Sequence, residues 1–193
     1  RADVSKILIQ DKKTIGVQLK NGQVLYSDAV ISNANIRRTF LDLVGHEHLP
    51  SHFVSRVEKL RPSNSAFMVS LAVDFVPDVN PSTFVLENND KINILIPSKV
   101  DPSLAPPGHA CVTLAKLLPH KDAITWNRDD GDYAERNKEY VNNLIRLAET
   151  AIPNLQEHII YRQDASPCTF ARYAQTTAGA IYGLAIDEWR PSM

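Results

Sequence analysis

The chain has 193 residues, 44% of them hydrophobic and 22% charged, and a formal net charge of -1 at pH 7. This length and apolar fraction suffice for one sizeable hydrophobic core, or for one core and part of another. The charge balance provides no basic surface for nucleic acid, and no segment approaches the run of about 18 apolar residues that a membrane-spanning helix needs. We therefore expect a soluble globular protein that does not bind nucleic acid.

The N-terminal segment is predicted to form short strands joined by tight turns. Residues 4–10 (VSKILIQ) are mostly apolar and favour a strand that is buried on more than one side. The pair Asn21-Gly22 supplies the positive φ angles that a tight hairpin turn requires. A further apolar run ends at Asn33, where the chain is expected to turn. The strands expected in this segment are 4–10, 15–19, 23–26 and 29–32.

Three helices are predicted from apolar residues that recur with a helical period. The first covers 36–44, and the second begins at Pro50 and ends before Pro62. The longest covers 133–151, with an apolar stripe on one face and Asp129 or Asp130 as its N-terminal cap.

The middle of the chain is predicted to be rich in β-structure. Residues 66–75 alternate between two sets of side chains, which is typical of a strand with one face on a core. The strands expected here are 66–75, 84–87, 92–96, 110–117 and 159–161. Their short, turn-separated spacing favours antiparallel pairing. We predict an α+β fold: a mixed, largely antiparallel sheet with helices packed on one face, one of them the helix over 133–151.

The titratable residues give no support for a metal site or a nucleophile. His46, His48 and His52 cluster, but zinc needs three or four converging ligands with partners of their own, and we predict no metal. Cys111 and Cys168 stand in unrelated apolar contexts, which favours free thiols over a disulfide. Neither lies near a helix start or a basic cluster that would activate it, so no catalytic residue is predicted.

Two segments carry a resemblance to a known family. They are GVQLKNGQVLYSDAVISNAN at 16–35 and RYAQTTAGAIYGLA at 172–185. Their order and spacing resemble the phytoene desaturase and carotenoid isomerase-related FAD-dependent oxidoreductases, in the stretch between the two halves of the FAD-binding fold. The sequence has no G-x-G-x-x-G phosphate-binding motif, and it begins with Arg1 rather than Met. We therefore interpret the chain as a central, mainly substrate-domain piece of such a protein.

The resemblance implies a division of the chain and a cofactor. Residues 1–35 would be a fragment of the FAD-binding domain, 36–175 the substrate-binding domain, and 176–193 a return segment toward the FAD-binding domain. The full-length protein would hold FAD and act on a lipophilic polyene such as a carotenoid, by desaturation or redox-linked isomerisation. The fragment itself is expected to hold no FAD and to be inactive, because the pyrophosphate-binding loop lies outside it.

The resemblance also assigns candidate site residues. Val4, Asn33, Gly179 and Gly183 would contact the cofactor, and Thr176 and Tyr182 the substrate. The glycines would let the backbone approach the flavin or the polyene closely. Simpler interpretations stand beside these: an ordinary strand valine, an asparagine that ends a strand, and a plain glycine turn.

Other functions and partners stay open. An amine-oxidising or fatty-chain-oxidising flavoenzyme of the same superfamily would share these features, as would a noncatalytic binding module on the same sheet. The proline-rich loop 101–108 resembles the branch of animal pyridine-nucleotide-disulfide-oxidoreductase-domain proteins, which leaves the substrate open. The expected partners are a lipophilic small molecule and the FAD-binding domain of the same chain. The expected location is cytoplasmic, with peripheral membrane contact of the parent left open. Self-association of the fragment is also left open, through an apolar patch at Ile7, Ile9, Val30, Ile31, Ile181 and Leu184.

Overall fold

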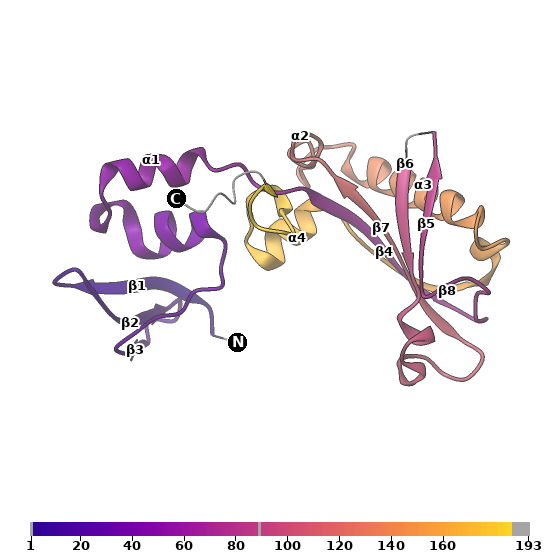
Figure 1. Cartoon of the computed structure of the whole chain (residues 1–193), viewed down its shortest axis with the longest axis horizontal. Helices are drawn as coiled ribbons and strands as arrows, with labels where there is room; N and C mark the ends of the chain where they lie inside the picture. Colours follow the sequence, from indigo (N-terminus) through magenta and orange to yellow (C-terminus); the bar gives the residue numbers. More distant parts are fainter. Residues whose placement is uncertain (1, 89, 187–193) are drawn as a thin grey trace.

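The computed structural model describes residues 2–88 and 90–186 and shows two lobes joined by a narrow waist (Figure 1). The N-terminal lobe holds a small sheet and a helical layer. Its elements are β1 (Val4–Gln10), β2 (Lys13–Leu19), β3 (Val24–Tyr26), the π-helix η1 (Arg38–Gly45), the 3-10 helix η2 (His46–His48) and α1 (Ser51–Lys59). The predicted hairpin and both predicted helices are confirmed.

The N-terminal lobe has a small core. Its three strands pair antiparallel in the order β1-β2-β3, and η1 packs on them through Leu43 and Val44 against Ile7. Phe40 joins η1 to α1 by an edge-on contact with Phe53, with the ring centroids 4.9 Å apart.

The strand predicted over 29–32 is wrong. These residues form no regular structure, and the side chain of Ile31 is 98% exposed. A strand requires a neighbour for its backbone hydrogen bonds, and within the described part of the chain no segment pairs with this one. The apolar composition of this segment favours a strand, but none of the described residues forms a partner strand beside it.

The second lobe is built on a five-stranded antiparallel sheet in the order β5-β6-β7-β4-β8. Its strands are β4 (Ser65–Val73), β5 (Ser82–Glu87), β6 (Asp90–Leu95), β7 (Ala110–Leu118) and β8 (Ile159–Ala165). Its helices are α2 (His120–Ala123), α3 (Tyr133–Glu149) and α4 (Pro167–Ala174), with the 3-10 helices η3 (Pro97–Lys99), η4 (Pro102–Leu104), η5 (Leu155–His158) and η6 (Thr177–Gly179). The α+β class and all five strands predicted for this region are confirmed.

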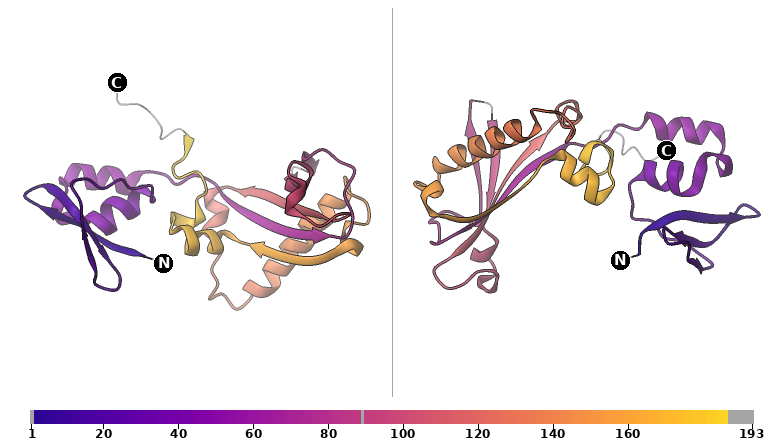
Figure 2. Two further views of the ribbon diagram at one scale, coloured as in Figure 1. Left: turned by 90° about the horizontal axis from the view of Figure 1, so that it is seen from below. Right: turned by 180° about the vertical axis from the view of Figure 1, so that it is seen from behind.

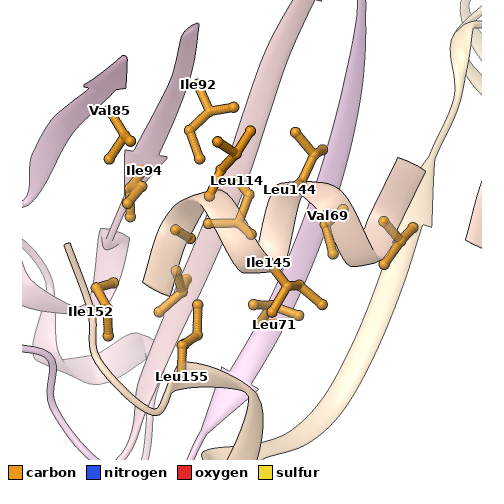
Figure 3. Close-up of a cluster of buried hydrophobic side chains, with 14 of the residues drawn as sticks. Val69, Leu71, Val85, Ile92, Ile94, Leu114, Leu144, Ile145, Ile152 and Leu155 are labelled. Atoms are coloured by element: carbon orange, nitrogen blue, oxygen red, sulfur yellow. The ribbon is translucent and has the colours of Figure 1, made fainter. Parts of the chain in front are cut away.

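Helix α3 covers one face of this sheet. Alternate residues of β4, among them Val69 and Leu71, point toward the helix, whose Leu144 and Ile145 fill the layer between (Figure 3). These side chains are at most 4% exposed, and burying each contributes roughly 1.5–3 kcal/mol. The expectation that this helix covers the sheet is confirmed, and Figure 2 shows it on one side only.

The predicted cap of α3 is wrong. The residue at the cap position is Asp132, and its side chain makes no capping hydrogen bond. The Asp130 carboxylate instead accepts from Asn127 Nδ2 at 3.2 Å, and the Asp130 carbonyl accepts from the Tyr133 N–H at 3.1 Å. The acidic run therefore closes the loop before the helix and leaves the helix end uncapped by a side chain.

The waist between the lobes is a pair of antiparallel segments. The N–H of Ser63 donates to Gly183, that of Ile181 to Asn64 and that of Ala185 to Arg61, all at 2.9–3.1 Å. The return segment from η6 onward is thereby hydrogen-bonded to the segment that leads into β4. In the ranges 2–88 and 90–186, no helix combines the length and the apolar character needed to cross a membrane.

Candidate functional site: an apolar groove on the open sheet face

The sheet face opposite α3 is the main open surface of the second lobe. Register places Phe84, Asn93, Ala115, Met68 and Ala165 in one row across all five strands. Phe84 is 62% exposed and Leu86 beside it 74%. The η3–η4 segment reaches only the far end of this face, where Ser98 Oγ accepts from the Cys111 N–H.

A groove of about 980 Å³, which we call the sheet groove, begins on this face and reaches the α3 side of the sheet, where Ile92, Leu118 and Trp126 belong to the core. Its floor is apolar and comes from β4, β5, β6 and β7, with the return segment at one side. The apolar lining residues are Ala66, Met68, Phe84, Ile92, Leu95, Ala115, Leu117, Leu118, Pro119, Trp126, Ile181 and Tyr182. An extended apolar surface of this size suits a lipophilic small molecule.

The sheet groove continues between β6 and β7 to the α3 side. The two strands pair only from Asn93 to Leu95 on β6, and Figure 1 shows them diverging beyond that point. In this opening Lys116 pairs with Asp90 at 2.6 Å. The sheet groove therefore has an apolar body and a polar end.

Two cations lie over aromatic rings at this polar end. Phe67, Trp126 and Tyr140 pack with centroids 4.7–5.4 Å apart. Lys116 Nζ lies 5.4 Å from the Tyr140 centroid, and the Arg136 guanidinium 4.4 Å from that of Trp126. We call Lys116, Arg136, Trp126 and Tyr140 the cationic end of the sheet groove.

Electrostatics at the cationic end keep both Lys116 and Tyr140 protonated. Burial alone would lower the pKa of Lys116, but the hydrogen bond to Asp90 and the nearby Tyr140 hydroxyl outweigh it and raise that pKa. Burial raises the pKa of Tyr140, against the opposing effect of Lys116. The tyrosine is therefore available as a hydroxyl donor at neutral pH.

Both predicted substrate residues lie in the return segment beside the second lobe. Tyr182 lines the sheet groove and is 65% exposed, while its N–H donates to Ser63 Oγ at 3.0 Å. Thr176 precedes η6, and its buried hydroxyl has no hydrogen-bond partner among the described residues.

The two predicted cofactor glycines have different surroundings. At Gly179 (φ +69°) a Cβ atom would lie 2.3 Å from the Pro167 carbonyl oxygen and 2.9 Å from Ser65 Oγ. Ser65 also donates to the Gly179 carbonyl at 2.8 Å, so backbone and side chain already fill this space. Gly183 (φ +77°) has no atom of the described residues within 4 Å of a Cβ position. Close packing thus accounts for a glycine at 179, whereas at 183 none of the described residues requires one by contact.

The other two predicted cofactor residues lie in the N-terminal lobe. Val4 begins β1 and packs beside the small core, and Asn33 is exposed in the loop before η1. The structure does not bring Val4 and Asn33 together with Gly179 and Gly183 in one cavity of the described residues. The flavin contacts of these four residues stay predictions.

The patch predicted from six apolar residues is only partly exposed. Ile31 is 98% exposed, but Ile7 is 4% exposed and belongs to the core. Among the residues that the structure describes, no three His, Cys, Asp or Glu side chains gather as a metal site would require. Cys111 and Cys168 are free thiols. The expectation that neither lies near a helix start is wrong for Cys168, which is the second residue of α4.

Sequence reasoning missed the cationic end. Lys116, Trp126 and Arg136 come from β7, the loop after α2, and α3, so no local motif joins them. The available signal was a lysine on the core-facing side of a predicted strand, since a charge there needs a partner.

Comparison with known proteins places the chain in a family. No family model matches it. It is 31% identical to prolycopene isomerase 2, chloroplastic, of an Oncidium hybrid cultivar, over 95% of this chain and 33% of that protein. It is 25% identical to 4,4'-diapolycopene oxygenase of a Methylomonas species, over 98% of this chain and 40% of that protein. The chain belongs to the phytoene desaturase and carotenoid isomerase-related oxidoreductase family. The resemblance found in the sequence is confirmed.

Solved structures share the fold of this family member. An oxidoreductase from Methanosarcina mazei superposes with a TM-score of 0.61 and 21% identity, over 86% of this chain and 37% of that one. A reduced UDP-galactopyranose mutase gives 0.59 and 12%, over 78% of this chain and 31% of that one. These likenesses concern the fold alone. The chain spans about a third of the length of the prolycopene isomerase that it matches.

Proposed function

We propose that this chain is the substrate-binding part of a flavin-dependent oxidoreductase that acts on a lipophilic polyene such as a carotenoid, by desaturation or redox-linked isomerisation. The observation that carries the proposal is the sheet groove, whose apolar part lies on the sheet face opposite α3 and is bordered by the return segment. Prolycopene isomerase and phytoene desaturase, which the chain resembles, are named for carotenoid substrates, and this supports the choice of ligand.

The proposal assigns the chemistry to FAD and the positioning to this chain. A flavin that is bound elsewhere in the full-length protein would accept the hydride, while the sheet face orients the polyene and excludes water. We further propose that the N-terminal lobe belongs with the FAD-binding domain. In this proposal the unit would extend past the predicted boundary at 35, which is supported by the packing of η1 on β1.

Blocking the sheet groove tests the proposal. Ala115 lies in the middle of the row across the sheet, so Ala115→Trp would fill the floor of the groove. Ala134→Trp on the exposed side of α3 makes the same change outside the groove and serves as the control. In the full-length, flavin-loaded protein we expect Ala115→Trp to lower carotenoid-driven flavin reduction at least about tenfold, the loss of roughly 1.4 kcal/mol of binding. Equal activity of the two variants, per mole of folded protein, would remove the sheet groove as the substrate site.

A further inference from the structure

The cationic end makes one end of the sheet groove positively charged, while the rest of the groove is apolar. Three cationic side chains line the groove, Lys91, Lys116 and Arg136, against two acidic ones, Asp90 and Asp122. Asp90 is neutralised by Lys116 at 2.6 Å. Arg136 has no carboxylate within salt-bridge distance among the described residues, which leaves its charge without a counter-ion. A pure hydrocarbon would bury part of this charge without compensating it.

Contacts around Arg136 hold its guanidinium in place without using its full capacity. Nη1 donates to the Thr125 carbonyl at 2.8 Å and Nη2 to Thr125 Oγ1 at 2.7 Å, while the plane lies against Trp126. A guanidinium has five N–H donors, so others remain for a ligand. A fixed, planar donor group of this kind matches the two oxygens of a carboxylate.

Tyr140 adds a neutral donor beside the two cations. It lies one turn after Arg136 on α3, and its ring packs between Lys116 and Trp126. A carboxylate at this point could accept from the Arg136 guanidinium and the Tyr140 hydroxyl. Asp122 also lines this end of the groove, and its negative charge would repel a carboxylate. The preference for an anionic ligand therefore depends on Arg136.

We propose that the sheet groove takes an elongated apolar ligand with a carboxylate at one end, and that Arg136 binds this carboxylate. The carboxylate end passes between β6 and β7 to Arg136 on the α3 side, and the apolar chain lies on the open face beside Ala115 and Met68. The inference rests on the proposed function, because it assumes that the groove holds the lipophilic substrate. The inference narrows the proposed substrate from any lipophilic polyene to a polyene that carries a carboxylate at one end.

Three matched probes test the inference on the full-length protein. Parinaric acid is a fluorescent polyene acid, and its methyl ester and the corresponding alcohol keep the chain but lose the charge. We expect the acid to bind about tenfold tighter than either, the effect of one charge-assisted contact. Salt should weaken binding of the acid and leave the ester unchanged.

Substitutions at Arg136 identify the residue that makes the difference. Arg136→Gln should weaken the acid about tenfold and change the ester less than about twofold. Lys138→Gln removes one charge from an exposed position of the same helix and should change neither. Arg136→Lys keeps the charge without the planar donor group and should give an intermediate affinity, which keeps the test valid where Arg136→Gln fails to fold.

The outcomes separate this inference from the proposed function. Equal binding of acid, ester and alcohol would overturn the carboxylate site and leave a lipophilic groove. If the alcohol bound as tightly as the acid and the ester bound more weakly, the groove would recognise a hydroxyl group and not a carboxylate. This result would also overturn the inference. Failure of all three probes to bind would overturn the proposed function itself.

Discussion

The two faces of the five-stranded sheet differ in what covers them, although both carry apolar side chains. Leu114 on β7 points toward α3 and is fully buried, while Leu117, three residues later in the same strand, is 49% exposed on the other face. Alternation along the strand puts the two leucines on opposite faces, but local sequence does not tell which face is covered. The difference comes from α3, and it shows that this fold covers one face of the sheet and leaves the other open.

The largest expected effect on stability comes from replacing these two leucines and comparing the results. Leu114→Ala removes a fully buried side chain from the layer under α3 and should lower the free energy of unfolding by about 2–5 kcal/mol. Leu117→Ala makes the same chemical change on the open face and should cost less than about 1 kcal/mol. Urea denaturation of the two variants in the full-length protein measures both. A loss of similar size at Leu117 would mean that the open face is covered in the whole protein.

Glycine substitutions apply the same comparison to the return segment. Gly179→Ala should lower the free energy of unfolding by about 2 kcal/mol or more, because the new Cβ meets the Pro167 carbonyl oxygen and the backbone has a positive φ. At Gly183 none of the described residues lies near a new Cβ, so Gly183→Ala should cost about 1 kcal/mol, from its positive φ.

Unfolding midpoints and flavin reduction, measured on both glycine variants, separate packing from function. The packing argument predicts that the Gly179 variant keeps its activity in proportion to the folded protein. A stable Gly179 variant with lost flavin reduction would contradict it and would favour the cofactor contact predicted from the sequence.

The sequence predicted the elements whose signal is local. Alternation along β4 and the Asn21-Gly22 turn each specify a structure by themselves, and the strand and the hairpin are found where expected. Of the two turn residues, however, Gly22 has a positive φ and Asn21 does not, so the turn is of another type than expected. The segment 29–32 has the composition of a strand but lacks a neighbour, so composition alone gave the wrong result. The cap of α3 was misplaced because several aspartates compete within one short loop.

The candidate site was less accessible to sequence reasoning than the fold. The return segment was found through its glycines and Tyr182, and Tyr182 lines the sheet groove. The cationic end was missed because Lys116, Trp126 and Arg136 come together only after the sheet and α3 have packed. Which face of the sheet stays open also depends on the position of α3, and a periodic pattern does not give that position.

The smallest expected effect is on the pH dependence of stability. It arises at the boundary between the two faces, where Tyr140 and Lys116 meet. The pKa of Tyr140 is raised above its usual 10.0, and that of Lys116 above its usual 10.5. A group whose pKa is raised by folding contributes stability that is fully present below its unfolded pKa and is lost as the pH rises through its folded pKa. Stability should therefore decline from about pH 10 upward, as the unfolded chain begins to lose protons that the folded chain retains.

Tyr140→Phe isolates this contribution, because phenylalanine keeps the ring against Phe67 and Trp126 but cannot ionise. At neutral pH the variant should be less stable than the wild type, because it lacks the hydroxyl. Above about pH 10 the wild type should lose stability faster than the variant, so that the two unfolding midpoints converge. Tyr161→Phe on β8, where the side chain is 61% exposed, makes the same change away from the cationic end and is the control. Thermal unfolding between neutral pH and about pH 11 measures the two slopes. Parallel pH profiles for wild type and Tyr140→Phe would show that the tyrosine is solvated, and the cationic end would then belong to the open face instead of the covered one.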